Sequence, residues 1–216
     1  MASRAELKEQ KKKISNALIN AAIELCDEDG YASLSIRSVA RKAGIAPTSF
    51  YRHFRDIDEL GVAIVEKANI VLTNCFQEIR KKISEHCGEQ ISPSEQFVQS
   101  IECVVRPFVE TFIACMKQNN QLLCLFFQER TGNSEQMRKA ISEDINNLIH
   151  TLSQDLKRLH QDISKDIFDI SLIAESMIAI ASYDSVAMLL DSPNESHQMS
   201  EKLIKKLYLL LLGAIK

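Results

Sequence analysis

The chain lacks any useful length of alternating apolar and polar residues, which is the pattern of a half-buried β-strand. Apolar residues instead recur three and four positions apart along most of the 216 residues. That spacing places them on one side of an α-helix. An apolar fraction of 45% is ordinary for a folded protein. The sequence therefore predicts an all-α fold, of a length that suits one large domain or two small ones.

A long uncharged apolar run is also missing, so we expect no transmembrane span. The first residues, MASRAELKEQKKK, are charged and contain no apolar signal core, so they do not form a secretory leader. Lys11, Lys12 and Lys13 are interpreted as a solvated helix start that could also reach a DNA backbone. These features predict a cytoplasmic protein that does not act at a membrane.

The six cysteines form no C-x-x-C pair, and no histidine stands at a spacing typical of a zinc finger, so we expect no metal site. Cys87, beside Gly88 in a polar segment, is the candidate for a reactive thiol. The other cysteines lie in apolar helical segments and are expected to be buried free thiols in a reducing cytosol; they are Cys26, Cys75, Cys103, Cys115 and Cys124.

The sequence also lacks a nucleophile–base pair and a phosphate-binding loop. We therefore predict no catalytic residue and no cofactor, and the chain is not expected to be an enzyme.

Acidic residues are absent from residues 30–55, which contain five lysines and arginines. The whole chain has a net charge of −3, so this cationic segment is local. Residues 1–60 hold ten Lys or Arg against nine Asp or Glu, and the remainder holds sixteen against twenty. Duplex DNA carries one negative charge per ~1.7 Å of its axis and releases counterions to a cationic partner. The charge distribution favours nucleic-acid binding near the amino end.

Residues 35–54 have the pattern of a helix-turn-helix. Ser35 suits a helix N-cap, and Gly44 suits the left-handed residue that ends the helix. Pro47 suits the first position of a second helix, in which Phe50 and Phe54 can both face the core. The remaining side chains of that helix mostly face outward and are candidate DNA contacts, together with Arg37 of the first helix; they are Thr48, Ser49, Tyr51, Arg52 and Arg55.

This segment resembles the DNA-binding head of the TetR family of bacterial regulators. The match includes Ala43-Gly44-Ile45 and Ser49-Phe50-Tyr51, followed by His53-Phe54 and Glu59-Leu60. GIAPTSFYRHFRD is closest in character to the repressors of unsaturated fatty-acid synthesis, and ERTGNS (129–134) is similar to the same subgroup. Two departures are Ile57, where most of the family has Lys, and Ala46, which replaces a Ser or Thr cap.

The resemblance implies a DNA-binding domain at residues 1–56 and a helical effector-binding and dimerisation domain at 57–216. It places Pro47, Thr48, Ser49, Tyr51, Arg52 and His53 on the recognition helix, and Arg37 on the supporting helix. Tyr51 and Arg55 match positions that touch phosphate. The expected partner is a palindromic double-stranded operator in a bacterial cytoplasm.

Two apolar groups of residues follow in the helical remainder. The first is interpreted as a core or as a pocket for a small hydrophobic effector, with arginines for an anionic head group; its candidate residues are Phe108, Phe112, Met116, Phe126, Phe127, Arg130 and Met177. The second lies in the last two helices and predicts a homodimer through a four-helix bundle, with an intrachain core as the alternative; its candidates are Ile173, Met177, Ile180, Leu203, Leu207 and Leu210.

The leading functional prediction is a TetR-type repressor of fatty-acid genes that responds to a long-chain acyl thioester. An alternative within the class is a multidrug or xenobiotic sensor. A lipid-binding or scaffold protein that never binds DNA is the alternative from another class.

Overall fold

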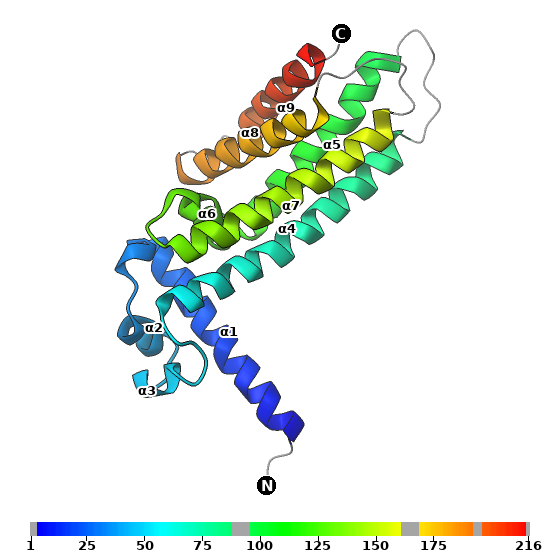
Figure 1. The fold of residues 1–216 in the computed structure, drawn as a ribbon. Helices are drawn as coiled ribbons and strands as arrows, with labels where there is room; N and C mark the ends of the chain where they lie inside the picture. Colours follow the sequence, from blue (N-terminus) through cyan, green and yellow to red (C-terminus); the bar gives the residue numbers. More distant parts are fainter. Residues whose placement is uncertain (1–3, 88–95, 161–168, 192–195, 215–216) are drawn as a thin grey trace. The chain divides into compact units, whose positions relative to one another are not determined.

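The computed structural model describes residues 4–87, 96–160, 169–191 and 196–214. Every regular element within these ranges is a helix, which confirms the all-α prediction (Figure 1). The elements are, in chain order, α1 (Arg4–Asp29), η1 (Tyr31–Ser33), α2 (Ile36–Lys42), α3 (Pro47–Phe50), α4 (Ile57–Cys87), α5 (Gln96–Gln118), α6 (Asn120–Gln128), η2 (Glu129–Thr131), α7 (Glu135–His160), α8 (Ile170–Asp191) and α9 (Ser196–Gly213).

The segments Gln118-Asn119-Asn120 and Thr131-Gly132-Asn133 have residues typical of turns, and helices end there: α5 ends at Gln118, and η2 ends at Thr131. Pro107 lies inside α5, and the helix continues through it to Gln118. The helix therefore tolerates the loss of one backbone donor, because its apolar side is held by packing within the second unit described below.

The contacts of the chain divide it into two compact units. The first unit joins Met1–Asn69 to Gln121–Ser142, and the second joins Ile70–Asn120 to Glu143–Lys216. The sequence predicted a functional boundary after residue 56, between a DNA-binding domain and an effector-binding and dimerisation domain. That boundary stays a prediction.

The first unit is built around a small apolar core. Helix α2 packs against α1 and α3 (Figure 1), and Leu18, Val39 and Phe50 are fully buried among them. The side chains of Leu123 and Phe126 from α6 are also buried in this part of the chain. Apolar burial of this kind contributes roughly 1.5–3 kcal/mol for each large side chain.

A polar cluster connects three segments of the first unit. The Tyr31 hydroxyl donates to the Ile57 carbonyl oxygen at 3.0 Å, at the first residue of α4. The Ser134 hydroxyl donates to an Asp58 carboxylate oxygen at 2.7 Å and accepts from the Met137 backbone N–H at 3.3 Å, so it caps α7. Burial, followed by the charge of Asp58, raises the pKa of Tyr31, which therefore stays a neutral donor.

The second unit contains the packed helices α5, α8 and α9 (Figure 1). Two ion pairs connect them: Arg106 to Glu201 at 3.0 Å and Lys206 to Asp184 at 2.7 Å. Helix α8 is long and apolar enough, by length and composition alone, to cross a membrane, and 44% of that segment is buried in the protein. Its packing against α5 and α9 is that of a core helix.

Gly44 is required by the turn that follows α2. Its φ is +71°, and its N–H and that of Ile45 donate to the carbonyl oxygens of Arg41 and Ala40, at 3.1 and 3.0 Å. This is the Schellman arrangement of backbone bonds, which confirms the predicted role of this glycine.

We expect Gly44→Ala to lower the free energy of unfolding by about 1–2 kcal/mol, because a Cβ is strained in the left-handed region. Urea unfolding followed by circular dichroism measures the change. Gly213→Ala is the matched control: no atom lies within 4 Å of an added Cβ at either glycine, but Gly213 has no positive φ. Equal stability of the two variants would contradict the strain argument.

Candidate nucleic-acid interface

The first helix of the predicted motif begins as the sequence indicates. The Ser35 hydroxyl accepts from the Ser38 backbone N–H at 3.1 Å, and the Ser35 N–H donates to the Ser38 hydroxyl at 3.1 Å. This reciprocal capping box starts α2, and the Gly44 turn ends it. Pro47 then occupies the first turn of α3, where its missing N–H leaves no helical bond unmade.

Two phenylalanines hold the second helix of the motif in place. Phe50 is fully buried and Phe54 nearly so, with ring centroids 5.8 Å apart. The α-helix itself covers only Pro47–Phe50, which is shorter than predicted. Turn-type bonds continue it, since the N–H groups of His53 and Phe54 both donate to the Phe50 carbonyl oxygen. We call Pro47–Phe54 the recognition segment.

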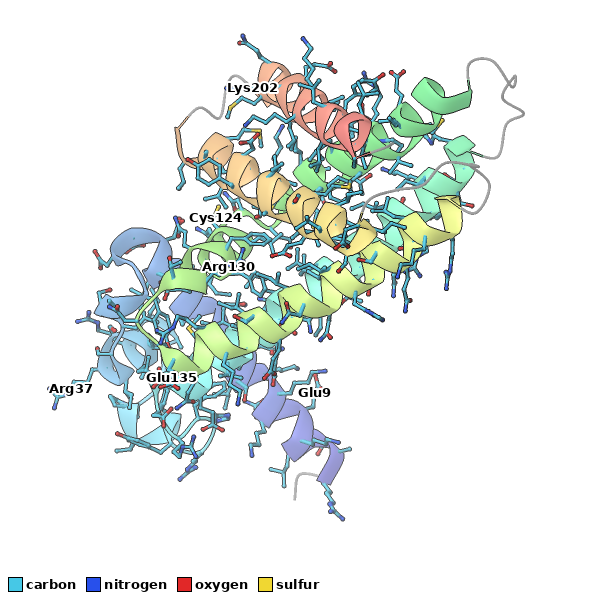
Figure 2. All side chains as sticks on the ribbon, turned by 45° about the horizontal axis from the view of Figure 1, so that its top comes forward. Glu9, Arg37, Cys124, Arg130, Glu135 and Lys202 are labelled. Atoms are coloured by element: carbon cyan, nitrogen blue, oxygen red, sulfur yellow. The ribbon has the colours of Figure 1, made fainter. Side chains whose placement is uncertain are left out.

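Several side chains of the motif point into solvent. Thr48, Tyr51 and Arg52 are exposed on the recognition segment, and 63% of the Tyr51 surface is accessible. Arg37 and Arg41 are exposed on α2. Figure 2 shows the Arg37 side chain pointing away from the helices of the first unit. We call these five residues the basic face. Ser49 is half-buried beside it, and Pro47 is exposed at its start.

The five cations of residues 30–55 are not equivalent. Lys42 pairs with Glu24 and Glu28 of α1 at 3.2 and 3.5 Å, and Arg55 pairs with Asp56 at 3.2 Å. Arg37, Arg41 and Arg52 form no ion pair with any residue that the structure describes. The absence of nearby acids in the sequence did not reveal this difference, because the partners of Lys42 lie in an earlier helix. Arg41 was not among the predicted DNA contacts, and its exposed position adds it.

His53 connects the recognition segment to α1. Its Nδ1 lies 3.0 Å from the Ser15 hydroxyl oxygen, and the side chain is half-buried. Burial lowers the pKa of His53, and the positive charges of Lys11 and Arg52 lower it further. The imidazole is therefore neutral at pH 7 and is occupied by a contact within the protein.

The turn into α4 is capped by two carboxylates. The Glu59 N–H donates to Asp56 Oδ1 at 2.8 Å, while the Glu59 carboxylate accepts from the Arg55 N–H. The Glu59 N–H bond is the main cause of the lowered pKa of Asp56. A capping arrangement for α4 is therefore present, with its return bond made one residue earlier than a standard capping box requires.

The candidate effector residues are divided between the two units. Phe108, Phe112, Met116 and Met177 are buried in the second unit, where the rings of Phe108 and Phe112 stack at 5.9 Å. In the first unit Phe126 is buried, Phe127 is half-buried and Arg130 is exposed. Sequence reasoning missed two residues of the second unit: the buried hydroxyls of Thr111 and Ser185 have no hydrogen-bond partner among the described residues.

The candidate dimer residues are also divided, by burial. Ile173, Met177, Leu203 and Leu207 are buried within the chain, so they contribute to its own core, whereas Ile180 and Leu210 are half-buried. Large apolar side chains that are exposed on α8 and α9 are Leu172, Tyr183, Leu190, Leu209 and Leu212. An open groove of about 400 Å³ lies between these helices, with Leu172, Leu209 and Leu210 in its lining.

Metal ligands are not grouped in the described ranges, where no cluster of three or more His, Cys, Asp or Glu side chains could hold an ion. Cys87, the candidate reactive thiol, lies outside the described side chains.

Residues 18–64 match the family of bacterial regulatory proteins named tetR, and this segment includes the capped α2, the Gly44 turn and the recognition segment. Regulators of this family are DNA-binding proteins that respond to small-molecule effectors without a cofactor, which agrees with the prediction that the chain is not an enzyme.

Solved structures of regulators have a similar fold over nearly their whole length. The fatty acid degradation regulator FadR from Bacillus halodurans is 16% identical with a TM-score of 0.65, over 93% of this chain and 95% of its own. The TetR family transcriptional regulator PfmR from Thermus thermophilus is 17% identical with a TM-score of 0.59, over 90% and 96%. Salmonella enterica GusR is 17% identical with a TM-score of 0.64, over 92% and 95%. Residues 18–64 thus match the tetR family of bacterial regulatory proteins, and the whole chain has the fold of TetR-type transcriptional regulators.

Proposed function

We propose that this protein is a repressor that binds a palindromic DNA operator as a homodimer and responds to a small hydrophobic effector. The observation that carries the proposal is the basic face, which combines three arginines without a described carboxylate partner with exposed Thr48 and Tyr51. Unpaired cations release counterions from DNA on binding, whereas cations already neutralised by the protein release fewer.

The residues of the basic face have distinct proposed roles. Arg52 extends from the recognition segment and can donate two hydrogen bonds to a guanine edge in the major groove. Tyr51 and Arg37 contact phosphates on either side, with Thr48 and Ser49 as further hydroxyl donors. Pro47 begins the recognition segment and fixes its backbone conformation there, rather than donating a hydrogen bond to DNA. His53 and Arg55 act less directly, because each already has a partner within the protein.

We expect Arg52→Ala to weaken specific operator binding by ~1–3 kcal/mol, since it removes a base contact. Lys42→Ala is the matched control: it removes the same charge from a side chain that is already paired with Glu24 and Glu28, so the loss is smaller. Fluorescence anisotropy with operator and with unrelated DNA, at several salt concentrations, measures both.

The same titration separates the alternatives. A loss for Arg52→Ala that is uniform across sequences would make Arg52 a phosphate contact. No binding by the wild type at low salt, to its own upstream DNA or to fatty-acid desaturation promoters, would overturn the repressor and favour a lipid-binding or scaffold protein.

We assign DNA binding to residues 1–56 and effector binding with dimerisation to residues 57–216. The proposed effector is a long-chain acyl thioester, and the regulated process is unsaturated fatty-acid synthesis. Two observations support this choice of effector and process. Apolar side chains are packed in the second unit, and a regulator named for fatty acid degradation has a similar fold. The two partnerless hydroxyls add a further argument, because a buried polar group without a hydrogen bond costs about 1–3 kcal/mol that a ligand oxygen would recover.

We expect Ser185→Ala to weaken acyl-CoA binding several-fold while making the free protein more stable than the wild type, because the substitution removes a buried hydroxyl that makes no bond within the described protein. Ser182→Ala is the matched control on the same helix: its hydroxyl donates to the Ala179 carbonyl oxygen at 3.1 Å. Isothermal titration with acyl-CoA and with cationic dyes gives the affinities. Tighter binding of the dyes would instead favour a multidrug sensor, and equal acyl-CoA affinity of all three proteins would remove Ser185 from the site.

We propose that the homodimer forms through α8 and α9 of two copies. Leu172, Leu190 and Leu209 are 54%, 58% and 66% exposed there, and a second copy would bury them together with half-buried Ile180 and Leu210. A two-fold axis makes such a patch complementary to itself. The interface would rest on buried side chains of the same two helices, which are Ile173, Met177, Leu203 and Leu207.

We expect Leu209→Asp to yield monomers in sedimentation velocity and to reduce operator binding, since each monomer reads only one half-site. Ile70→Asp is the matched control, because Ile70 is 64% exposed on α4. A dimer that survives Leu209→Asp, or dissociates equally with Ile70→Asp, would place the interface elsewhere.

A further inference from the structure

The amino-terminal part of α1 is not used by the core of the first unit. Every residue from 4 to 13 is exposed, and the first fully buried side chain of the helix is that of Leu18. Figure 1 shows this part of α1 projecting free of α2. About three turns of helix therefore present their side chains to solvent or to a partner.

Two contacts fix α1 just after these exposed turns. The Ser15 hydroxyl oxygen lies 3.0 Å from Nδ1 of His53 in the recognition segment, and Lys67 Nζ of α4 donates to Asn20 Oδ1 at 2.6 Å. The face of α1 that carries Ser15 is thus the one turned toward the recognition segment. Lys11 lies on this face, since the Ser15 hydroxyl also donates to the Lys11 carbonyl oxygen at 3.1 Å. Burial lowers the pKa of His53, and the charge of Lys11 lowers it further, which agrees with this placement.

Four cations gather on this face of the helix. Lys11, Lys8 and Arg4 stand four, seven and eleven residues before Ser15. In a helix of 3.6 residues per turn, these offsets place all three within about 40° of Ser15. Lys12, three residues before Ser15, borders the same face. We call Arg4, Lys8, Lys11 and Lys12 the α1 stripe, and none of the four forms an ion pair with a carboxylate in the described ranges.

The acids of these turns lie on other faces. Glu6 and Glu9 stand nine and six residues before Ser15, which places them about 180° and 120° from it. Lys13 stands two residues before Ser15 and is about 160° away, so it lies on the opposite side of the helix from the stripe. The sequence grouped Lys11, Lys12 and Lys13 as one run, whereas the helix separates the last of them from the other two.

The position of Arg4 favours an anionic partner rather than the helix itself. Arg4 is the first residue of α1, and a cation in the first turn opposes the helix macrodipole. The backbone N–H groups at the start of a helix attract anions such as phosphate. The cations of the stripe and the start of the helix therefore attract the same kind of group.

We propose that the α1 stripe binds the phosphate backbone of DNA beside the groove that the recognition segment enters, an inference that rests on the proposed function. The eleven residues from Arg4 to Ser15 span about 16 Å of helix. Phosphates of one strand are spaced about 3.4 Å apart along the duplex axis, so the stripe covers about five of them. Phosphate contacts carry no sequence information, so the stripe adds affinity while Arg52 of the recognition segment discriminates between sequences.

The stripe is tested on the full-length protein by the salt dependence of DNA binding. We expect Lys8→Ala to reduce the slope of log affinity against log salt by ~0.9, and Lys8→Ala with Lys11→Ala to reduce it by ~1.8, because each lysine that neutralises a phosphate releases counterions. Affinity should fall several-fold, and equally for the protein's own upstream DNA and an unrelated duplex of the same length. Fluorescence anisotropy over a series of salt concentrations measures both quantities.

Lys13→Ala is the matched control, because it removes the same charge from an exposed lysine of the same helix on the opposite face. It should leave the slope at the wild-type value, and circular dichroism verifies that all variants are folded. Equal slopes for Lys8→Ala and Lys13→Ala would overturn the stripe, as would a loss confined to the upstream DNA.

The repressor itself is judged separately in the same titrations. If Arg52→Ala loses the preference for upstream DNA while the stripe variants behave like Lys13→Ala, the stripe is overturned and the proposed function stands. A wild-type protein that binds neither duplex at low salt overturns both.

Discussion

The burial of Phe50 and Phe54 is the interaction on which the proposed DNA-binding surface depends. An α-helix of four residues has too few internal hydrogen bonds to be stable alone. The two rings fasten the recognition segment to the first unit and leave Tyr51 and Arg52 facing solvent. Because the Gly44 turn sets where that segment begins, the positions of the exposed side chains follow from one turn and two buried rings.

Ion pairs within the protein distinguish the cations of the motif from one another. The carboxylates of α1 neutralise Lys42, and Asp56 neutralises Arg55, so the charge that remains for a partner is concentrated on Arg37, Arg41 and Arg52. A net charge of −3 for the whole chain does not oppose this, since exposed charges further than about 8–10 Å apart are largely screened at physiological salt. Local pairing therefore identifies the proposed DNA-binding surface better than composition does.

The second unit combines a tightly packed apolar core with a few polar groups that the core does not need. Thr111 and Ser185 contribute buried hydroxyls without described partners. Such groups lower the stability of a core unless they gain a partner. An oxygen of the proposed effector would supply one.

The sequence alone determined the helical class, the capping of α2 by Ser35, the turn at Gly44 and the start of α3 at Pro47, because each depends on neighbours within a few residues. Helical periodicity likewise identified the inward Phe50 and Phe54. Only the tertiary structure decided that Lys42 is paired, that His53 contacts Ser15, and that Ile173 and Leu207 belong to the chain's own core. These outcomes depend on which faces of distant helices come together, and a local pattern carries no information on that pairing.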